Sequence, residues 1–447
     1  MIDFVYLPIE IKNREFHAKL LLATQCLALG QSVVVGRRLP ATHAIFKDRK
    51  SAILYKSAAK VDEENFLRFA ELGHNVYSLD EEGFLVDSLS FFVNKRFTSP
   101  NVRASTGVFC WGDVQAQALK EHYPEGTGKI WVSGNPRVDL WRNFYYGLYA
   151  REVVEIKKRY ADYVFVPSTF AVTSPYKKEG VVERLRKLGF ISGDADLKKF
   201  EALERSLVSM RSAFAEAIDV LSREFGKIFI IRPHPSEDST FWDEYFDDHP
   251  FVRITDQYTV SPWVMGACAV LHNSCTTAIE SGFYGVPTIA YLPSGQQHQI
   301  AMNFANVSSH RAEDLITLRA LLRRAFDGDL APQDWPETIS GYLSDIDNSA
   351  QYIAQHLVKN SRETQILPFR VNYAKIAKFA FLRFLMRVGV MRNSKIVNEF
   401  RYRFAKFDRT SVTEVSDFVR LIAASLFPDL EFNVVEIEPN LFHLTKA

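Results

Sequence analysis

The chain has 447 residues, of which 47% are hydrophobic and 24% charged, and its formal net charge is +1. This length allows two domains with further structure, and the near-neutral charge argues against nucleic acid as the main partner. The four cysteines include no CxxC pair, which favours reduced thiols over disulfides or a zinc site. The start "MIDFVYLPIE" is unlike a signal peptide, and no uncharged apolar run of about 18 residues occurs. We therefore expect a cytoplasmic protein without a membrane span.

The first third of the chain alternates strand and helix patterns. "FVYLP" (4–8) and "SVVVG" (32–36) are short β-branched runs that end in Pro or Gly. Between them, "NREFHAKLLLATQCLALG" has helical periodicity and ends at Gly30, which can cap a helix. Further strands are expected near Ile53, Val76, Phe109 and Trp131. Such alternation predicts a parallel sheet with crossover helices.

The same pattern begins again near residue 162, with the strand candidates "YVFVPS", "KIFIIRP", "FVRIT", "CAVLHNS" and "PTIAYLP". We therefore predict an α/β protein with two Rossmann-like domains facing across a cleft. The expected limits are 1–150 for the N-terminal domain, 151–335 for a nucleotide-binding domain, and 336–447 for a basic, amphipathic helical extension that could cross back to the N-terminal domain. In that extension, "VSDFVRLIAASLF" and "EFNVVEIE" predict one more helix and strand.

Open α/β sheets bind ligands beyond the carboxyl ends of their strands, and "RPHP" follows such a strand. Arg232 and His234 can both donate to phosphate oxygens and stabilise a departing nucleotide. The alternative for His234 is a solvated loop residue.

A second polar cluster, "NSCTT", precedes a predicted helix. Helix N-terminal amides and hydroxyls form anion sites, although Ser274 or Thr276 could simply cap the helix. Glu280, one turn later, could accept hydrogen bonds from a ribose or be a solvated charge. The candidate nucleotide-binding residues are Arg232, His234, Asn273, Ser274, Thr276, Thr277 and Glu280.

Three adjacent acids, Asp80, Glu81 and Glu82, precede Gly83 in the first half. Like charges repel, so at least one of these carboxyls should have a raised pKa if partly buried. The run suits a general base or a carboxylate nucleophile facing a sugar. Alternatively, it is an acidic helix start.

The stretch "SGNPRVD" also ends a predicted strand. Gly134 permits a tight turn, Asn135 can bond its own backbone, and Pro136 can open a helix. Asn135 and Arg137 are candidates for substrate binding and Asp139 for a nucleophile. The alternative is a strand-to-helix turn with an Arg–Asp pair.

Charged residues follow the first two predicted strands. Glu10, Lys12, Arg14 and Glu15 follow the first, and Arg37 and Arg38 the second. The four bases could bind an anionic sugar or acceptor, and Glu10 is a further candidate for substrate binding. The alternative is that these are solvated charges. No GxGxxG occurs, which argues against an NAD-type site.

Taken together, "LPIEIKNREFHAKLLLA", "VVVGRR", "DEEGF", "GNPRVD", "RPHP" and "HNSCTTAIESGFYGVP" resemble bacterial surface-carbohydrate biosynthesis proteins related to retaining β-Kdo transferases. The resemblance spans roughly residues 1–300. It implies a GT-B glycosyltransferase of lipopolysaccharide or capsule assembly that uses a CMP-activated, Kdo-like acidic sugar, with a glycan or lipid-linked glycan acceptor. It implies Glu82 as the catalytic acid of an acid-acid-glycine motif, with Glu81 the alternative, and no metal or cofactor.

Two other functions stay open. A glycerophosphotransferase using CDP-glycerol would share the His-Pro and Ser/Thr elements. A non-catalytic module that binds nucleotide sugar would share the fold.

Residues 369–410 carry eleven Lys and Arg against two acids. On a helix over 373–390, Lys375, Lys378, Arg383 and Arg387 lie in one half and an apolar stripe lies opposite. Such a helix could contact an anionic membrane from the cytoplasm, or pack on the protein's own core.

Overall fold

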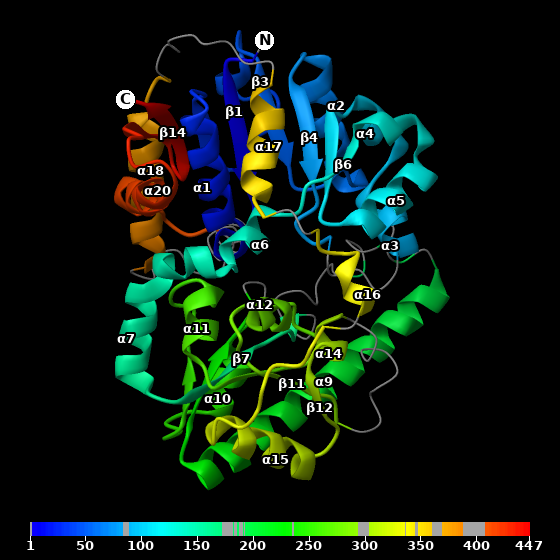
Figure 1. The fold of residues 1–447 in the computed structure, drawn as a ribbon, viewed down its shortest axis with the longest axis vertical. Helices are drawn as coiled ribbons and strands as arrows, with labels where there is room; N and C mark the ends of the chain where they lie inside the picture. The colour runs from blue at the N-terminus through cyan, green and yellow to red at the C-terminus, as the bar shows by residue number, and fades with distance from the viewer. Residues whose placement is uncertain are drawn as a thin grey trace. The chain divides into compact units, whose positions relative to one another are not determined.

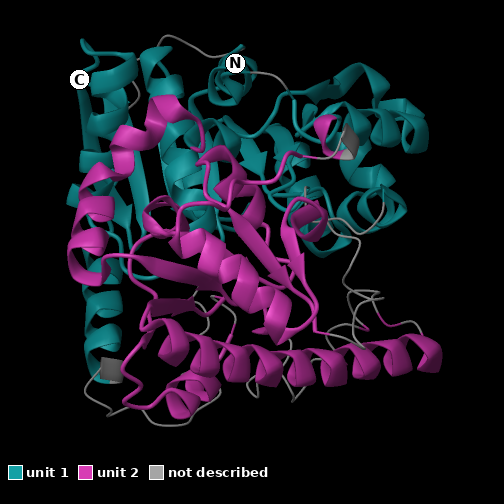
Figure 2. Cartoon of the chain, turned by 60° about the horizontal axis from the view of Figure 1, so that its bottom comes forward, with its two compact units in different colours: residues 1–140, 341–447 teal, residues 141–340 magenta. Residues whose placement is uncertain are grey.

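The computed structural model describes residues 2–83, 89–171, 182, 186, 191, 193–234, 237–293, 304–335, 337–344, 347–359, 369–387 and 407–447. The chain divides into two compact units, shown in Figure 2. Unit 1 comprises residues 1–140 and 341–447, and unit 2 comprises residues 141–340. The carboxyl-terminal segment therefore clusters with the amino-terminal residues. The domain limits expected at residues 150 and 335 stay predictions.

Unit 1 is built on an eight-stranded sheet in the order β13-β14-β2-β1-β3-β4-β5-β6 (Figure 1). Strands β1 to β6 are parallel, and the carboxyl-terminal hairpin β13–β14 pairs antiparallel with β2. The strands are β1 (Phe4–Ile9), β2 (Val33–Arg37), β3 (Ser51–Tyr55), β4 (Asn75–Leu79), β5 (Gly107–Cys110), β6 (Ile130–Val132), β13 (Phe432–Glu438) and β14 (Leu441–Lys446).

The helices of unit 1 are α1 (Lys12–Ala28), α2 (Glu63–Glu71), α3 (Leu89–Arg96), α4 (Ser99–Ala104), α5 (Asp113–His122), α6 (Pro136–Leu140), α17 (Ser349–Val358), α18 (Tyr373–Arg387) and α20 (Val412–Leu426). Helix α1 packs against α6, α17 and α20, so both ends of the chain share one helical layer. Gly30, at φ +80, follows α1, and Pro136 is the first residue of α6. Both sequence predictions are confirmed.

Unit 2 is built on a six-stranded parallel sheet in the order β12-β11-β10-β7-β8-β9. Its strands are β7 (Tyr163–Pro167), β8 (Ile228–Arg232), β9 (Val252–Ile254), β10 (Ala269–His272), β11 (Thr288–Tyr291) and β12 (His310–Ala312). Its helices are α7 (Ala150–Tyr160), α9 (Asp194–Phe225), α10 (Thr240–Tyr245), α11 (Val260–Gly266), α12 (Thr277–Phe283), α14 (Phe304–Val307), α15 (Leu315–Phe326) and α16 (Glu337–Ser340).

The two sheets explain the near-continuous apolar runs in the sequence. All residues of β1, β7 and β10 are buried, as expected for parallel strands covered by helices on both faces. The predicted α/β fold with parallel sheets is confirmed. Within the described ranges, every helix is too short or too polar to traverse a lipid bilayer.

The contact between β2 and the carboxyl-terminal hairpin depends on Gly36. A Cβ atom at this position would lie 2.1 Å from the Asn440 carbonyl oxygen, and the φ of Gly36 is +143. We expect Gly36→Ala to lower the free energy of unfolding by about 2 kcal/mol or more, because the hairpin must shift and the backbone is strained. Urea denaturation measures this. Gly128→Ala, where a Cβ meets nothing within 4 Å, is the control. Equal stability of both variants would contradict the close approach.

Candidate functional site

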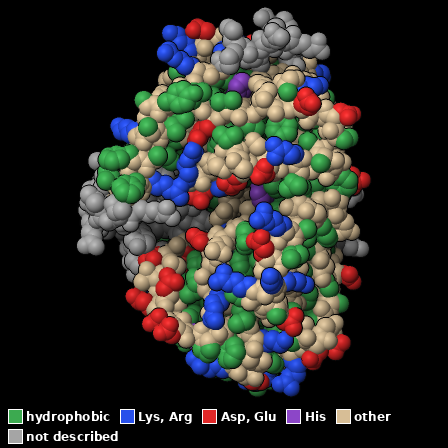
Figure 3. All heavy atoms as spheres, turned by 90° about the vertical axis from the view of Figure 1, so that its left-hand side faces the viewer, with side chains coloured by type: hydrophobic (Ala, Val, Ile, Leu, Met, Phe, Trp, Pro, Cys, Tyr) green, Lys and Arg blue, Asp and Glu red, His purple; other side chains and the backbone are tan. Residues whose placement is uncertain are grey.

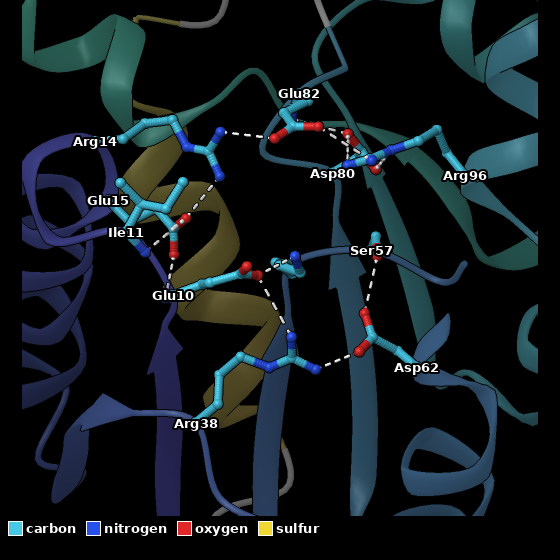
Figure 4. A network of polar contacts seen from close by, with 11 residues as sticks. Glu10, Ile11, Arg14, Glu15, Arg38, Ser57, Asp62, Asp80, Glu82 and Arg96 are labelled. Atoms are coloured by element: carbon cyan, nitrogen blue, oxygen red, sulfur yellow. Dashed lines mark hydrogen bonds and ion pairs between the residues drawn. The ribbon is translucent and has the colours of Figure 1, made fainter. Parts of the chain in front are cut away.

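A network of charged side chains lies beyond the carboxyl ends of the parallel strands of unit 1 (Figure 4). The loops and helix starts that follow β1 to β4 supply it, together with α3. Its members are Glu10, Arg14, Glu15, Arg38, Lys56, Ser57, Asp62, Asp80, Glu82 and Arg96. Ligands of open α/β sheets bind at this edge.

Glu15 fixes one side of the network. Its side chain is fully buried and accepts hydrogen bonds from the backbone N–H groups of Glu10 (2.8 Å) and Ile11 (3.3 Å). Arg14 Nη2 donates to the same carboxylate at 2.8 Å. A buried charge is tolerated only when it is paired and hydrogen-bonded, so Glu15 holds the guanidinium of Arg14 in place.

Asp80 fixes the other side. It is buried and accepts hydrogen bonds from Arg96 Nε (2.7 Å) and Nη2 (3.1 Å) and from the backbone N–H of Glu82 (2.8 Å). Burial raises the pKa of Asp80, and Arg96 only partly opposes this. We expected at least one of the three adjacent acids to have a raised pKa. Asp80, the first of the three, has one.

Glu82 lies between these two arginines. Its carboxylate oxygens lie 2.8 Å from Arg14 Nη1 and 3.1 Å from Arg96 Nη1, and its side chain is 36% exposed. Burial alone would raise the pKa of Glu82, but the two guanidiniums outweigh it and lower the pKa to about 2. Glu82 is therefore an ionised, accessible carboxylate at neutral pH.

Glu81, the alternative catalytic acid, points into the protein. It is 3% exposed and its carboxylate lies 2.8 Å from Lys19 Nζ. Burial tends to raise its pKa, yet Lys19 lowers it overall. Arg137 Nη1 donates to the carbonyl oxygen of Glu81 at 3.2 Å. Of the two candidate acids, Glu82 is the accessible one.

Glu10 and Arg38 belong to a second part of the network. Lys56 and Arg38 pair with Glu10, and Arg38 also pairs with Asp62, which accepts a hydrogen bond from Ser57 Oγ at 3.3 Å. Sequence reasoning missed Lys56, Asp62 and Arg96. Lys56 directly follows β3, so the strand-end rule could have found it.

Lys12 and Arg37 contact the carboxyl-terminal segment. Lys12 Nζ lies 3.0 Å from Asp408 and 2.7 Å from Glu414. Arg37 Nε donates to the carbonyl oxygen of Pro439 at 3.0 Å and its guanidinium pairs with Glu438. These contacts connect the two ends of unit 1, and a role of either base in substrate binding stays a prediction.

Asn135 and Asp139 make contacts typical of structural residues. Asn135 is 1% exposed and its Oδ1 accepts the Arg137 N–H at 2.9 Å. Asp139 is fully buried and accepts the N–H groups of Ser349 (3.1 Å) and Ala350 (2.8 Å), at the start of α17. A nucleophile needs an accessible face, and burial denies one to Asp139. We therefore leave it out of the chemistry proposed below.

In unit 2, hydrogen bonds connect the loops that follow three adjacent strands. β7 lies between β8 and β10. Thr169, after β7, donates to Asn273 Oδ1 after β10 at 2.5 Å. Ser168 Oγ donates to Glu237 at 2.7 Å, and Glu237 also accepts the His234 N–H at 3.3 Å and Trp242 Nε1 at 2.7 Å. Burial raises the pKa of Glu237. Sequence reasoning missed Ser168, Thr169 and Glu237.

Arg232 makes its described hydrogen bonds to a neighbouring loop. It is 5% exposed, and its guanidinium donates to the carbonyl oxygens of Asp256 (3.2 Å), Gln257 (2.6 Å) and Tyr258 (2.6 Å). Burial lowers the pKa of Arg232 to about 10. These three contacts hold the loop after β9, and phosphate binding by Arg232 stays a prediction.

The hydroxyl-rich loop after β10 is shaped by His272. This buried imidazole accepts the N–H groups of Ser274 (3.1 Å) and Cys275 (3.3 Å) at Nδ1, and burial lowers its pKa to about 3. Ser274 has a φ of +85 and its Oγ accepts a hydrogen bond from Asn306 Nδ2 at 2.8 Å. Thr276 precedes α12, in which Thr277 is the first residue.

The other predicted nucleotide contacts differ in their exposure. Glu280 is 6% exposed and accepts a hydrogen bond from Ser261 Oγ at 2.5 Å, so its contact with a ribose stays a prediction. Asn273 and Thr277 are buried, whereas Thr169, His234, Ser274 and Thr276 are half-buried. In the part of the chain that the structure describes, no group of three or more His, Cys, Asp or Glu side chains could hold a metal ion.

No protein-family model and no curated protein matches the chain. Solved structures resemble it at low identity. The UDP-GlcNAc 2-epimerase of Methanocaldococcus jannaschii, in complex with UDP-GlcNAc and UDP, is 12% identical, covers 80% of this chain and 99% of its own, and has a TM-score of 0.48.

A putative UDP-N-acetylglucosamine 2-epimerase from Listeria monocytogenes is 9% identical, covers 82% of this chain and 99% of its own, and has a TM-score of 0.49. The wall teichoic acid polymerase TagF is 9% identical, covers 80% of this chain and 89% of its own, and has a TM-score of 0.48. Because these scores stay below 0.5, the fold assignment depends on the sheet topology described above.

The contacts of Asp139 predict a large structural effect. We expect Asp139→Ala to lower the free energy of unfolding by about 2 kcal/mol, because two buried backbone N–H groups at the start of α17 lose their acceptor. Urea denaturation measures the change. The control is Asp113→Ala, an exposed acid in the first turn of α5, which should change stability by no more than about 0.5 kcal/mol. An Asp139 variant as stable as this control would contradict the structural role of these two hydrogen bonds.

The lowered pKa of Glu82 predicts a pH effect on stability. An unfolded glutamate has a pKa of about 4.3, so ionised Glu82 stabilises the fold above that pH, and this contribution is lost as the pH falls through about 2. The stability of wild type relative to Glu82→Gln should therefore decline from about pH 6 to about pH 3, measured by urea denaturation. Glu64→Gln, an exposed acid on α2, is the matched change outside the network. A difference that is constant with pH would contradict the pairing of Glu82.

Proposed function

We propose that this protein is a glycosyltransferase that moves an acidic, Kdo-like sugar from a CMP-activated donor to a bacterial surface glycan or glycolipid. The observation that carries the proposal is Glu82, an accessible carboxylate kept ionised between Arg14 and Arg96 at the ligand-binding edge of a parallel sheet. The motif series of the sequence analysis supports the donor class.

The charge state of Glu82 selects its chemical role. Glycosyl transfer passes through a transition state with positive charge at the anomeric carbon, and a nearby carboxylate stabilises that charge or attacks the carbon. A general acid must carry a proton, and an efficient general base has a pKa near the working pH. With a pKa of about 2, Glu82 suits neither task well. We therefore assign it as nucleophile or electrostatic stabiliser, which is compatible with retention by double displacement.

The surroundings of Glu82 fit an acidic sugar. A guanidinium presents a fork of N–H donors that matches a carboxylate, and Arg14 and Arg96 place two such groups beside the reacting acid. In unit 2, Thr169, His234, Ser274 and Thr276 are half-buried polar groups at the carboxyl edge of the sheet, and we assign them to the nucleotide.

The test combines binding with turnover. We expect CMP to raise the melting temperature more than UMP, UDP or GDP does, and purified protein to hydrolyse or transfer from CMP-Kdo. Glu82→Gln should lose at least about a hundredfold in kcat, the scale for removing one preorganised charge contact, and still be stabilised by CMP. Glu64→Gln, an exposed acid on α2, should keep wild-type turnover.

Other outcomes would replace the proposal. Turnover of CDP-glycerol in place of CMP-Kdo, with full activity of Glu82→Gln, would indicate a glycerophosphotransferase. Stabilisation by nucleotides without turnover of either donor would indicate a binding module.

A further inference from the structure

Helix α18 of unit 1 presents an apolar stripe to solvent. At about 100° per residue, Tyr373, Ala377, Phe381 and Phe384 fall within an arc of roughly 80°. These side chains are exposed, with Tyr373 at 76%, Phe381 at 60% and Phe384 at 58%. Large aromatic side chains gathered on one helical face and left in water are a mark of an interaction surface.

The opposite face of α18 is the one that contacts the protein. Lys375 lies roughly 165° around the helix from the middle of the stripe, and its Nζ pairs with Glu438 of β13 at 2.8 Å. The backbone N–H of Asn372, just before the helix, donates to the carbonyl oxygen of Ile437 on the same strand at 2.9 Å. These contacts fix the rotation of α18, so the stripe points away from the sheet.

The charges beside the stripe select its partner. The sequence of α18 contains no acid. Lys378 lies about 60° beyond one edge of the stripe, and Arg383 about 80° beyond the other. Among the described residues, neither base forms an ion pair. Figure 3, which views the side where Figure 1 labels α18 and α20, shows hydrophobic side chains beside lysine and arginine side chains.

An apolar stripe with a base on each side matches an anionic lipid surface. Aromatic rings enter the interface between headgroups and acyl chains, and flanking lysine and arginine side chains reach the phosphates. The 15 residues of α18 span about 22 Å, which is less than the hydrocarbon core of a bilayer. We propose that α18 docks flat on an anionic membrane through Tyr373, Phe381 and Phe384, with Lys378 and Arg383 on the headgroups. This inference is independent of the chemistry proposed above.

The experiment is co-sedimentation of the full chain with phosphatidylcholine vesicles with and without phosphatidylglycerol. We expect binding only to the anionic vesicles, and weaker binding at high salt. Phe381→Ser combined with Phe384→Ser should reduce the partition coefficient at least about tenfold, because two rings no longer leave water. Lys378→Glu combined with Arg383→Glu should reduce it about 30-fold or more.

Matched controls test whether the position matters. Phe144→Ser removes a phenyl ring that is also 60% exposed, and Lys198→Glu reverses an exposed charge on α9. Both should bind anionic vesicles like wild type. The proposal is overturned if wild type ignores lipid charge, or if the α18 variants bind as well as these controls. It is also overturned if wild type binds no vesicles and instead forms a dimer in sedimentation velocity. If the changes at Phe381 and Phe384 then dissociate this dimer, the stripe binds a second copy of the chain.

Discussion

The pairing of Arg14 with the fully buried Glu15 is the interaction on which the candidate site of unit 1 depends. Glu15 is tolerated in the interior because two backbone N–H groups and one guanidinium saturate its oxygens. That requirement orients Arg14, whose second terminal nitrogen is then directed at Glu82. Asp80 does the same for Arg96 from the other side. Two buried acids thus position two bases, and these bases keep the accessible Glu82 ionised.

In unit 2, buried polar side chains shape the loops at the carboxyl edge of the sheet. The neutral His272 holds the backbone of the loop after β10, Glu237 joins the loops after β7 and β8, and Arg232 binds three carbonyl groups. Removing a partner from such a buried group costs more than the hydrogen bond itself contributes. Variants of these residues are therefore expected to disturb the loops whether or not the residues touch substrate, and activity alone would not identify their role.

The sequence predicted the sheets well because their signal is local. Short β-branched runs, a glycine after α1 and a proline at the start of α6 each depend on a few neighbouring residues. The pairing of β14 with β2 was missed, since it joins Leu441 to Gly36 across the whole chain. The strand-end rule located Arg14 and Glu82, but it could not show that Asp139 is buried under α17 or that Arg232 binds carbonyl groups. Motif position indicates which edge a side chain occupies, and only the fold shows what it contacts.

The ion pairs of Arg14 and Arg96 place a condition on any anionic ligand. Arg14 and Arg96 already pair with Glu15, Asp80 and Glu82, so a carboxylate or phosphate that binds them competes with these partners. Glu15 and Asp80 are buried and hydrogen-bonded to backbone N–H groups, which makes their displacement costly. Glu82 is the most accessible of the three partners, with a side chain that is 36% exposed. Under the proposed function, an acidic substrate would therefore compete for the two guanidiniums with Glu82 more than with Glu15 or Asp80.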